Sequence, residues 1–163
     1  MTNNDILRRL RFTFDLNDKN MMALFQEGGV TASRAQISDW LKQEDDEAYV
    51  RLTDNEFASF LNGFIVSRRG KKEGPPAVAE RKINNNIIFR KIRIALDFKE
   101  DDVLRTLQLV QFNLSSSELS AFFRKSTHKH YRECQDQVLR NFLHGIQLKF
   151  KPETGESSTS DEV

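Results

Sequence analysis

The chain uses one stretch twice: NNDILRRLRFTFD stands at residues 3–15, and NNIIFRKIRIALD stands at residues 85–97. The same register continues without a gap, so that residues 3–65 align with residues 85–147, and 14 of the 63 aligned pairs are identical. A match of this length and continuity indicates an internal duplication of the chain.

The repeated stretch predicts an amphipathic helix. Its apolar residues fall at the spacing of one buried helical face: Ile6, Leu7, Leu10 and Phe14. Asn3 or Asn4 is expected to cap the helix, because an asparagine side chain can accept a hydrogen bond from an unpaired backbone N–H of the first turn. The other face is predicted to carry four polar residues that are identical in both copies: Asn4, Arg8, Arg11 and Asp15, repeated as Asn86, Arg90, Arg93 and Asp97.

Three further helical patterns follow in each copy. Apolar residues cluster in residues 21–25, 37–41 and 57–65 of the first copy and recur in residues 103–107, 119–123 and 138–146. A unit of about 65 residues buries only about 60% of its unfolded surface alone, so the copies are expected to share a core. The sequence therefore predicts an all-α protein of two tandem four-helix repeats packed against each other, either with approximate two-fold symmetry or side by side.

A glycine stands in the middle of the predicted fourth helix of both copies, as Gly63 and Gly145. Glycine inside a helix costs about 1 kcal/mol relative to alanine. Its presence in both copies predicts the close approach of another backbone, most simply that of the first helix of the same unit.

Changes in composition mark four segments of the chain. Residues 1–66 form the first repeat and residues 85–150 form the second. Residues 67–84, with the run RRGKKEGPP, have the charge, glycine and proline content of an exposed linker. Residues 151–163 are acidic and almost free of apolar side chains, which predicts a disordered tail.

The two copies differ in charge. Residues 1–65 carry 7 basic and 11 acidic residues, whereas residues 85–147 carry 10 basic and 7 acidic residues. The contrast is sharpest after the third predicted helix, where the first copy has the acidic run EDDE at residues 44–47 and the second has RKSTHKHYR at residues 124–132. The predicted cores are therefore alike, and the surfaces differ.

The repeated arginine pairs admit two interpretations. Arg8 and Arg11, with their counterparts Arg90 and Arg93, can form intramolecular ion pairs, for the first copy with Asp15 and Asp54. Alternatively, the two pairs form anion sites, because guanidinium groups bind phosphate and carboxylate groups in a bidentate manner. Both interpretations remain open at this stage.

A nucleic-acid site is a further candidate. The second and third predicted helices of the first copy resemble a helix-turn-helix, but Asp39 and the acidic run at residues 44–47 would repel phosphates. In the second copy, a basic segment with a tyrosine that could stack on bases is the better candidate, and its residues are Lys125, Lys129, Tyr131 and Arg132. A solvated basic loop explains the same residues without a ligand.

The sequence favours neither a metal nor a cofactor site. The spacing of His128, His130 and Cys134 matches no structural zinc pattern, and Leu52 at the counterpart of Cys134 indicates a core position for this thiol. Because Cys134 is the single cysteine, no intrachain disulfide can form. Neither a targeting segment nor a membrane-spanning segment is predicted, and a cytoplasmic location is expected.

Several motifs together resemble the YehS family of bacterial proteins. These motifs are NDILRRLR at residues 4–11, SFLNGFI at 59–65, RGK at 69–71, RKINNNI at 81–87 and YREC at 131–134. The resemblance covers residues 3–147. It implies a small bacterial cytoplasmic protein with two copies of a domain of unknown function, and it supplies no catalytic residues.

The sequence alone thus predicts a non-enzymatic module that binds a partner protein or acts in regulation, and the partner is unknown. The alternative is a nucleic-acid-binding regulator that uses the basic surface of the second repeat: Arg90, Arg93, Lys125, Lys129 and Arg132. An enzyme ranks third among the possibilities. No acid, base or nucleophile stands at a spacing that suggests catalysis.

Overall fold

The computed structural model describes residues 1–152, which form eight α-helices and no strand. The first repeat contains α1 (Asn3–Thr13), α2 (Asp18–Glu27), α3 (Arg34–Trp40) and α4 (Asp54–Arg69). The second contains α5 (Asn85–Ala95), α6 (Glu100–Gln108), α7 (Ser116–Phe122) and α8 (Asp136–Phe150). Each helix of the second repeat begins at the residue that aligns with the start of its counterpart. The predicted all-α fold of two tandem four-helix repeats is confirmed.

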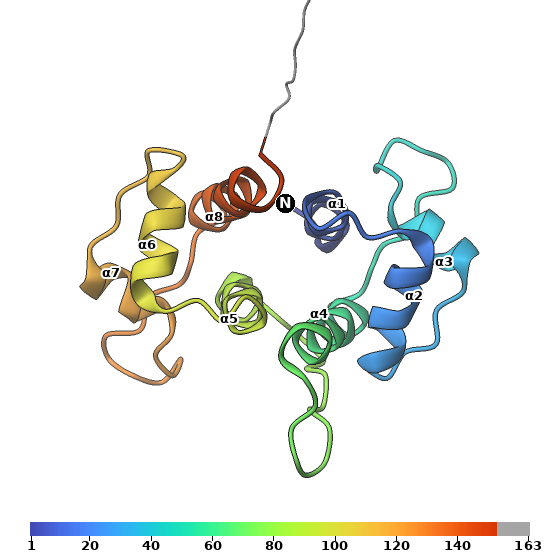
Figure 1. The fold of residues 1–163 in the computed structure, drawn as a ribbon, viewed down its shortest axis with the longest axis horizontal. Coiled ribbons are helices and arrows are strands. Elements are labelled where there is room, and N and C mark those ends of the chain that lie inside the picture. Colours follow the sequence, from blue (N-terminus) through green and yellow to red (C-terminus); the bar gives the residue numbers. More distant parts are fainter. Residues whose placement is uncertain (153–163) are drawn as a thin grey trace, which may run out of the picture.

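The first and last helices of both repeats form the centre of the molecule (Figure 1). Helix α4 packs against α5, and α1 packs against α8. Helices α2 and α3 flank this central bundle at one end, and α6 and α7 flank it at the other. Exchanging the two repeats leaves this pattern of contacts unchanged, so of the two predicted arrangements the structure has the approximate two-fold one.

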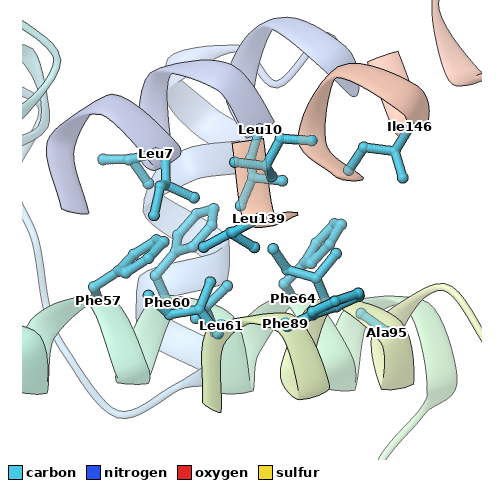
Figure 2. Packing of buried hydrophobic residues seen from close by; sticks show 14 of the residues in the cluster. Leu7, Leu10, Phe57, Phe60, Leu61, Phe64, Phe89, Ala95, Leu139 and Ile146 are labelled. Atoms are coloured by element: carbon cyan, nitrogen blue, oxygen red, sulfur yellow. The ribbon is translucent and has the colours of Figure 1, made fainter. Parts of the chain in front are cut away.

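The core runs through the central bundle from one repeat into the other. Figure 2 shows Leu7 and Leu10 of α1 above Phe60 and Phe64 of α4, with Leu139 of α8 between them. Large rings fill much of this space, and the ring centroids of Phe89 and Phe142 in the second repeat lie 4.5 Å apart. Because the residues of both repeats belong to one buried cluster, neither repeat has a separate core.

Threonine, serine and asparagine side chains cap the helices of the first repeat. The caps are Thr2, Asn17, Ser33 and Thr53, and each accepts a hydrogen bond from the third residue of its helix. The predicted capping of α1 by Asn3 or Asn4 is wrong, because α1 begins at Asn3 and Thr2 precedes it. Asn4 instead turns into the protein interior.

The two helical glycines allow close contact between neighbouring helices, but the predicted neighbour is wrong. A Cβ atom on Gly63 would lie 1.8 Å from the carbonyl oxygen of Leu24 in α2. A Cβ atom on Gly145 would lie 2.4 Å from the carbonyl oxygen of Thr106 in α6. The second helix of each repeat, and not the first, therefore crosses the fourth helix at its glycine.

Two further observations bear on the sequence predictions. Lys151, at the start of the segment predicted to be a disordered tail, is half-buried and contacts α1. The remainder of that segment, from residue 153, lies outside the described residues. Within residues 1–152, no helix has both the length and the apolar character needed to cross a bilayer.

Candidate binding groove in the second repeat

A buried asparagine at the start of α1 positions the loop that follows α3. The Asn4 amide nitrogen donates hydrogen bonds of 2.9 Å to the carbonyl oxygens of Trp40 and Val50. Its Oδ1 accepts hydrogen bonds from the Leu52 N–H at 3.0 Å and from the Tyr49 hydroxyl at 3.1 Å. One fully buried side chain thus fixes both ends of the loop.

Asn86 does the same in the second repeat. Its amide nitrogen donates to the carbonyl oxygens of Phe122 at 3.0 Å and Arg132 at 2.8 Å, and its Oδ1 accepts from the Cys134 N–H at 2.9 Å. The prediction that Asn4 and Asn86 lie on a polar outer face is therefore wrong. Both copies have an asparagine at this position because its side chain holds the loop in place.

A groove with three arginines lies where the end of α4 meets α5 and the end of α7. It is a cavity of about 390 Å³ lined by Arg69, Arg90, Arg93, Ile94, Asp97, Phe98 and Phe123. The apolar side chains form part of the lining, and Ile94 is 42% exposed. The groove therefore combines positive charge with an apolar surface that faces solvent.

The three arginines of this groove are held to different degrees. The Arg93 Nε donates to the carbonyl oxygen of Phe98 at 3.0 Å, and its guanidinium carbon lies 4.7 Å from the centroid of the Phe123 ring. Arg69 pairs with Asp97 at 2.7 Å. Arg90 is exposed and has no ion-pair or hydrogen-bond partner among residues 1–152. Its guanidinium group is therefore available to an anion.

In the first repeat, the arginine that corresponds to Arg90 is paired within the protein. Arg8, the counterpart of Arg90, forms an ion pair with Asp5 and donates to the carbonyl oxygen of Lys42 at 3.0 Å. Burial acts to raise the pKa of Asp5, but hydrogen bonds from Thr2 and Arg8 and the Arg8 charge outweigh it and hold that pKa below its usual value. In the second repeat, Ile87 stands where the first has Asp5.

The predicted intramolecular partners of the pair Arg8 and Arg11, which were Asp15 and Asp54, are wrong. Asp15 pairs with Lys151 at 2.5 Å, and Asp54 accepts hydrogen bonds from the side chain of Asn3 and the backbone of Ile83. Arg11, the other arginine of the first pair, is exposed on α1. The carboxylate that pairs with Arg8 is that of Asp5, one turn earlier on α1. Asp5 has no acidic counterpart in the second copy, so the comparison of the copies does not predict this ion pair.

The basic loop at residues 124–132 adjoins the groove at Phe123. Its backbone is fixed, because the Arg132 N–H donates to Ala121 at 3.2 Å and the Arg132 carbonyl accepts from Asn86. The side chains of Lys125, Lys129 and Arg132 are exposed, and Tyr131 is half-buried. The loop thus presents exposed basic side chains beside the groove, on a backbone that is anchored at Arg132.

The thiol of Cys134 lies in the protein interior. Cys134 is 4% exposed, and burial raises the pKa of its thiol to about 12. A nucleophilic thiolate is the reactive form of cysteine, so this thiol is unsuited to nucleophilic attack near neutral pH. Within the described residues, no three His, Cys, Asp or Glu side chains form a group suited to a metal ion.

Comparison with known proteins assigns the family. A family model described as "Protein of unknown function (DUF1456)" matches residues 3–70 and 85–151. The chain belongs to this family. The "Uncharacterized protein YehS" of Escherichia coli (strain K12) is 45% identical over 147 residues, which cover 90% of this chain and 94% of that relative. No solved structure matches significantly. The description of the DUF1456 family names no activity, so the function is argued from the groove.

The site residues singled out in the sequence are brought together only in part. Arg90 and Arg93 share the groove, whereas Lys125, Lys129 and Arg132 lie in the adjoining loop. Sequence reasoning missed Arg69, Phe98 and Phe123 as groove residues. One sequence feature could have identified Arg69: it aligns with Lys151 in the register of the duplication, so both copies have a cation after the fourth helix. In the structure, Arg69 pairs with Asp97 and Lys151 pairs with Asp15.

Proposed function

We propose that this protein is a non-enzymatic binding module that takes an acidic segment of a partner protein into the groove of the second repeat. The observation that carries this proposal is the exposed guanidinium of Arg90, which has no partner within residues 1–152. In the first repeat, Arg8 pairs with Asp5. In the second repeat, Ile87 stands at the position of Asp5, so Arg90 lacks this carboxylate.

The shape and chemistry of the groove favour a peptide over a small inorganic anion. Arg93 lies over the Phe123 ring, with its Nε occupied by the Phe98 carbonyl. This arrangement leaves the terminal guanidinium nitrogens for a carboxylate, because an arginine presents five donors in a planar fork. Ile94 and Phe98 add an apolar surface that a leucine or phenylalanine beside the acidic residues would cover.

The direct test is fluorescence anisotropy with a short labelled peptide rich in Glu, Asp and Leu, at an ionic strength of about 0.15 M. A charged hydrogen bond contributes about 1.5–3 kcal/mol, so Arg90→Ala is expected to weaken binding by about tenfold or more. The Arg8→Ala variant is the matched control, because Arg8 already pairs with Asp5. Its affinity should equal that of the natural protein.

Equal losses from Arg90→Ala and Arg8→Ala would contradict the assignment of the site to the second repeat. Binding of a lysine-containing peptide of the same length with similar affinity would contradict the requirement for an acidic ligand. Circular dichroism of each variant shows whether the helices are retained, so that a folding defect is distinguished from a binding defect.

Nucleic acid is the second candidate ligand, and the exposed side chains of Lys125, Lys129 and Arg132 support it. Mixed-sequence single-stranded and duplex oligonucleotides serve as probes in the same assay. Binding that persists at about 0.15 M salt and is lost in the double variant Lys129→Glu and Arg132→Glu would favour this candidate, because phosphate contacts weaken steeply with salt. A cytoplasmic location belongs to the same proposal.

A further inference from the structure

The linker between the repeats docks against α4 and α5. The Asn55 side chain donates to the carbonyl oxygens of Ala79 and Glu80 at 3.2 and 3.1 Å. The Glu80 carboxylate lies 3.1 Å from the Nζ of Lys91, an α5 side chain that is 8% exposed. The Lys91 Nζ also donates to Asn62 of α4 at 2.6 Å. The α4–α5 edge thus holds a non-helical segment through its backbone and through one carboxylate.

The two asparagines of α4 that contact the linker and Lys91 have polar counterparts on α8. These are Gln137 and His144, and Arg140 stands between them where α4 has Ala58. Because residues separated by one or two helical turns lie on one face, these three side chains form a polar stripe along α8. All three are exposed. In Figure 1, α8 and α1 lie across the central bundle from the green linker loop beside α4.

Arg9 of α1 lies beside this polar stripe. It is the counterpart of Lys91, and α1 packs against α8 as α5 packs against α4. Arg9 is half-buried and has no ion-pair partner among residues 1–152. Burial, and to a smaller degree the nearby Arg140 charge, lower the pKa of Arg9. The α1–α8 edge therefore has two neighbouring guanidinium groups where the α4–α5 edge has one lysine.

The two edges also correspond where the fourth helices begin. The Ile83 N–H donates to Asp54 at 3.0 Å, and its counterpart, the amino group of Met1, donates to Asp136 at 3.4 Å. Asp136 lies one turn before Arg140 and is engaged by Met1. Arg140 forms no ion pair within residues 1–152. The part of the chain that the structure describes thus supplies the α1–α8 edge with no counterpart of the Glu80 carboxylate.

We propose that the α1–α8 edge is a second binding site, which takes an extended acidic segment of a partner protein in the way that the α4–α5 edge takes the linker. In this site, Gln137 binds the backbone of the segment, as Asn55 binds the linker. Arg9 and Arg140 pair with two neighbouring Asp or Glu residues, because a guanidinium group binds a carboxylate in a bidentate manner. The site is separate from the groove of the second repeat and does not depend on the ligand of that groove.

The test is a titration of the full ¹⁵N-labelled protein with a synthetic peptide that copies residues 77–83, AVAERKI, with Glu in place of Arg81. This change gives the peptide two neighbouring carboxylates, one for each guanidinium group. The expected result is a set of backbone amide shift changes around Arg9 in α1 and from Gln137 to His144 in α8. These changes should saturate at peptide concentrations on the order of mM.

Arg140→Gln is the principal variant, because Arg140 is exposed and its replacement leaves the core intact. It should weaken binding of the peptide about tenfold, as expected for the loss of one charged hydrogen-bonded pair. The matched control is Arg11→Gln, which removes an equal charge from an exposed position on α1. Its affinity should stay within about twofold of that of the natural protein.

Three results would overturn the proposal. Shift changes confined to the groove around Arg90, or no shift changes at all, would show that the α1–α8 edge is not a binding site. Equal losses of affinity from Arg140→Gln and Arg11→Gln would show a general attraction of charge in place of a defined site. Equal binding of a peptide with Gln at both Glu positions would contradict the requirement for carboxylates. Shift changes in α1 and α8 without changes at the groove would support this inference and count against the proposed function.

Discussion

The arginine in the middle of the first helix, Arg8 in the first repeat and Arg90 in the second, has a different residue one turn before it in each repeat. In the first repeat, Asp5 engages Arg8, and in the second, Ile87 stands at the equivalent position and leaves Arg90 exposed. Around this difference the helices begin at equivalent positions, and the buried Asn4 and Asn86 make equivalent hydrogen bonds. The comparison teaches that one substitution on a helix surface can leave a cation unpaired while the helix positions and the hydrogen bonds of the buried asparagine stay equivalent.

The helical glycines provide the prediction with the largest expected effect. Gly63→Ala places a methyl group 1.8 Å from the Leu24 carbonyl oxygen, whereas Gly145→Ala places it 2.4 Å from that of Thr106. Because a backbone carbonyl cannot move without shifting its helix, Gly63→Ala should lower the free energy of unfolding by about 3 kcal/mol or more, and Gly145→Ala by less. Urea denaturation followed by circular dichroism measures both. An equal or larger loss from Gly145→Ala would contradict this ranking.

The buried asparagines come next. Asn4→Ala leaves two carbonyl groups and an N–H without a partner and should cost about 3 kcal/mol of unfolding free energy. Asn86→Ala should cost about 2 kcal/mol, because no tyrosine hydroxyl adds to its hydrogen bonds as Tyr49 does in the first repeat. Asn113→Ala, at an exposed position, should stay within about 0.5 kcal/mol of the natural protein. Losses of that small size at Asn4 would show that the loop is held by other contacts.

Much of the fold could be predicted from the sequence, because the spacing of Ile6, Leu7 and Leu10 and its repetition at residues 88–92 reflect burial directly. The contacts of Gly63 could not be predicted. A glycine inside a helix indicates that another backbone lies close, but it does not indicate which helix supplies that backbone. The burial of Asn4 and Asn86 could not be predicted either, because an asparagine on a helix is polar whether it faces water or buried carbonyl groups.

The groove was predicted less completely than the fold. Arg90 and Arg93 stood out because they repeat Arg8 and Arg11, but the presence of Arg69 and Phe123 in the same groove depends on how three helices pack. The residue that distinguishes the two surfaces, Ile87, was not recognised, since an isoleucine in a helix is ordinarily a packing residue. Local spacing thus identified the cations, and only tertiary structure identified their neighbours.

The smallest expected effect concerns the acid dependence of stability. The pKa of Asp5 lies below its usual value in the folded protein, so its ion pair stabilises the fold above the unfolded pKa of about 3.9 and ceases to do so as the pH falls through the folded pKa. Asp5→Asn should therefore cost a few tenths of a kcal/mol at neutral pH and nothing at strongly acidic pH. Thermal melts across this range measure the difference. Ile87→Asn in the second repeat should show no such dependence on pH.

The most direct test of the central claim is to exchange the two residues that distinguish the repeats. In the double variant Asp5→Ile and Ile87→Asp, the acidic peptide should bind the first repeat, because Arg8 loses its carboxylate and Arg90 gains one. Isothermal titration with that peptide should then depend on Arg8 and no longer on Arg90, as judged by adding Arg8→Ala or Arg90→Ala to the double variant. Binding that still depends on Arg90 after the exchange would contradict the account.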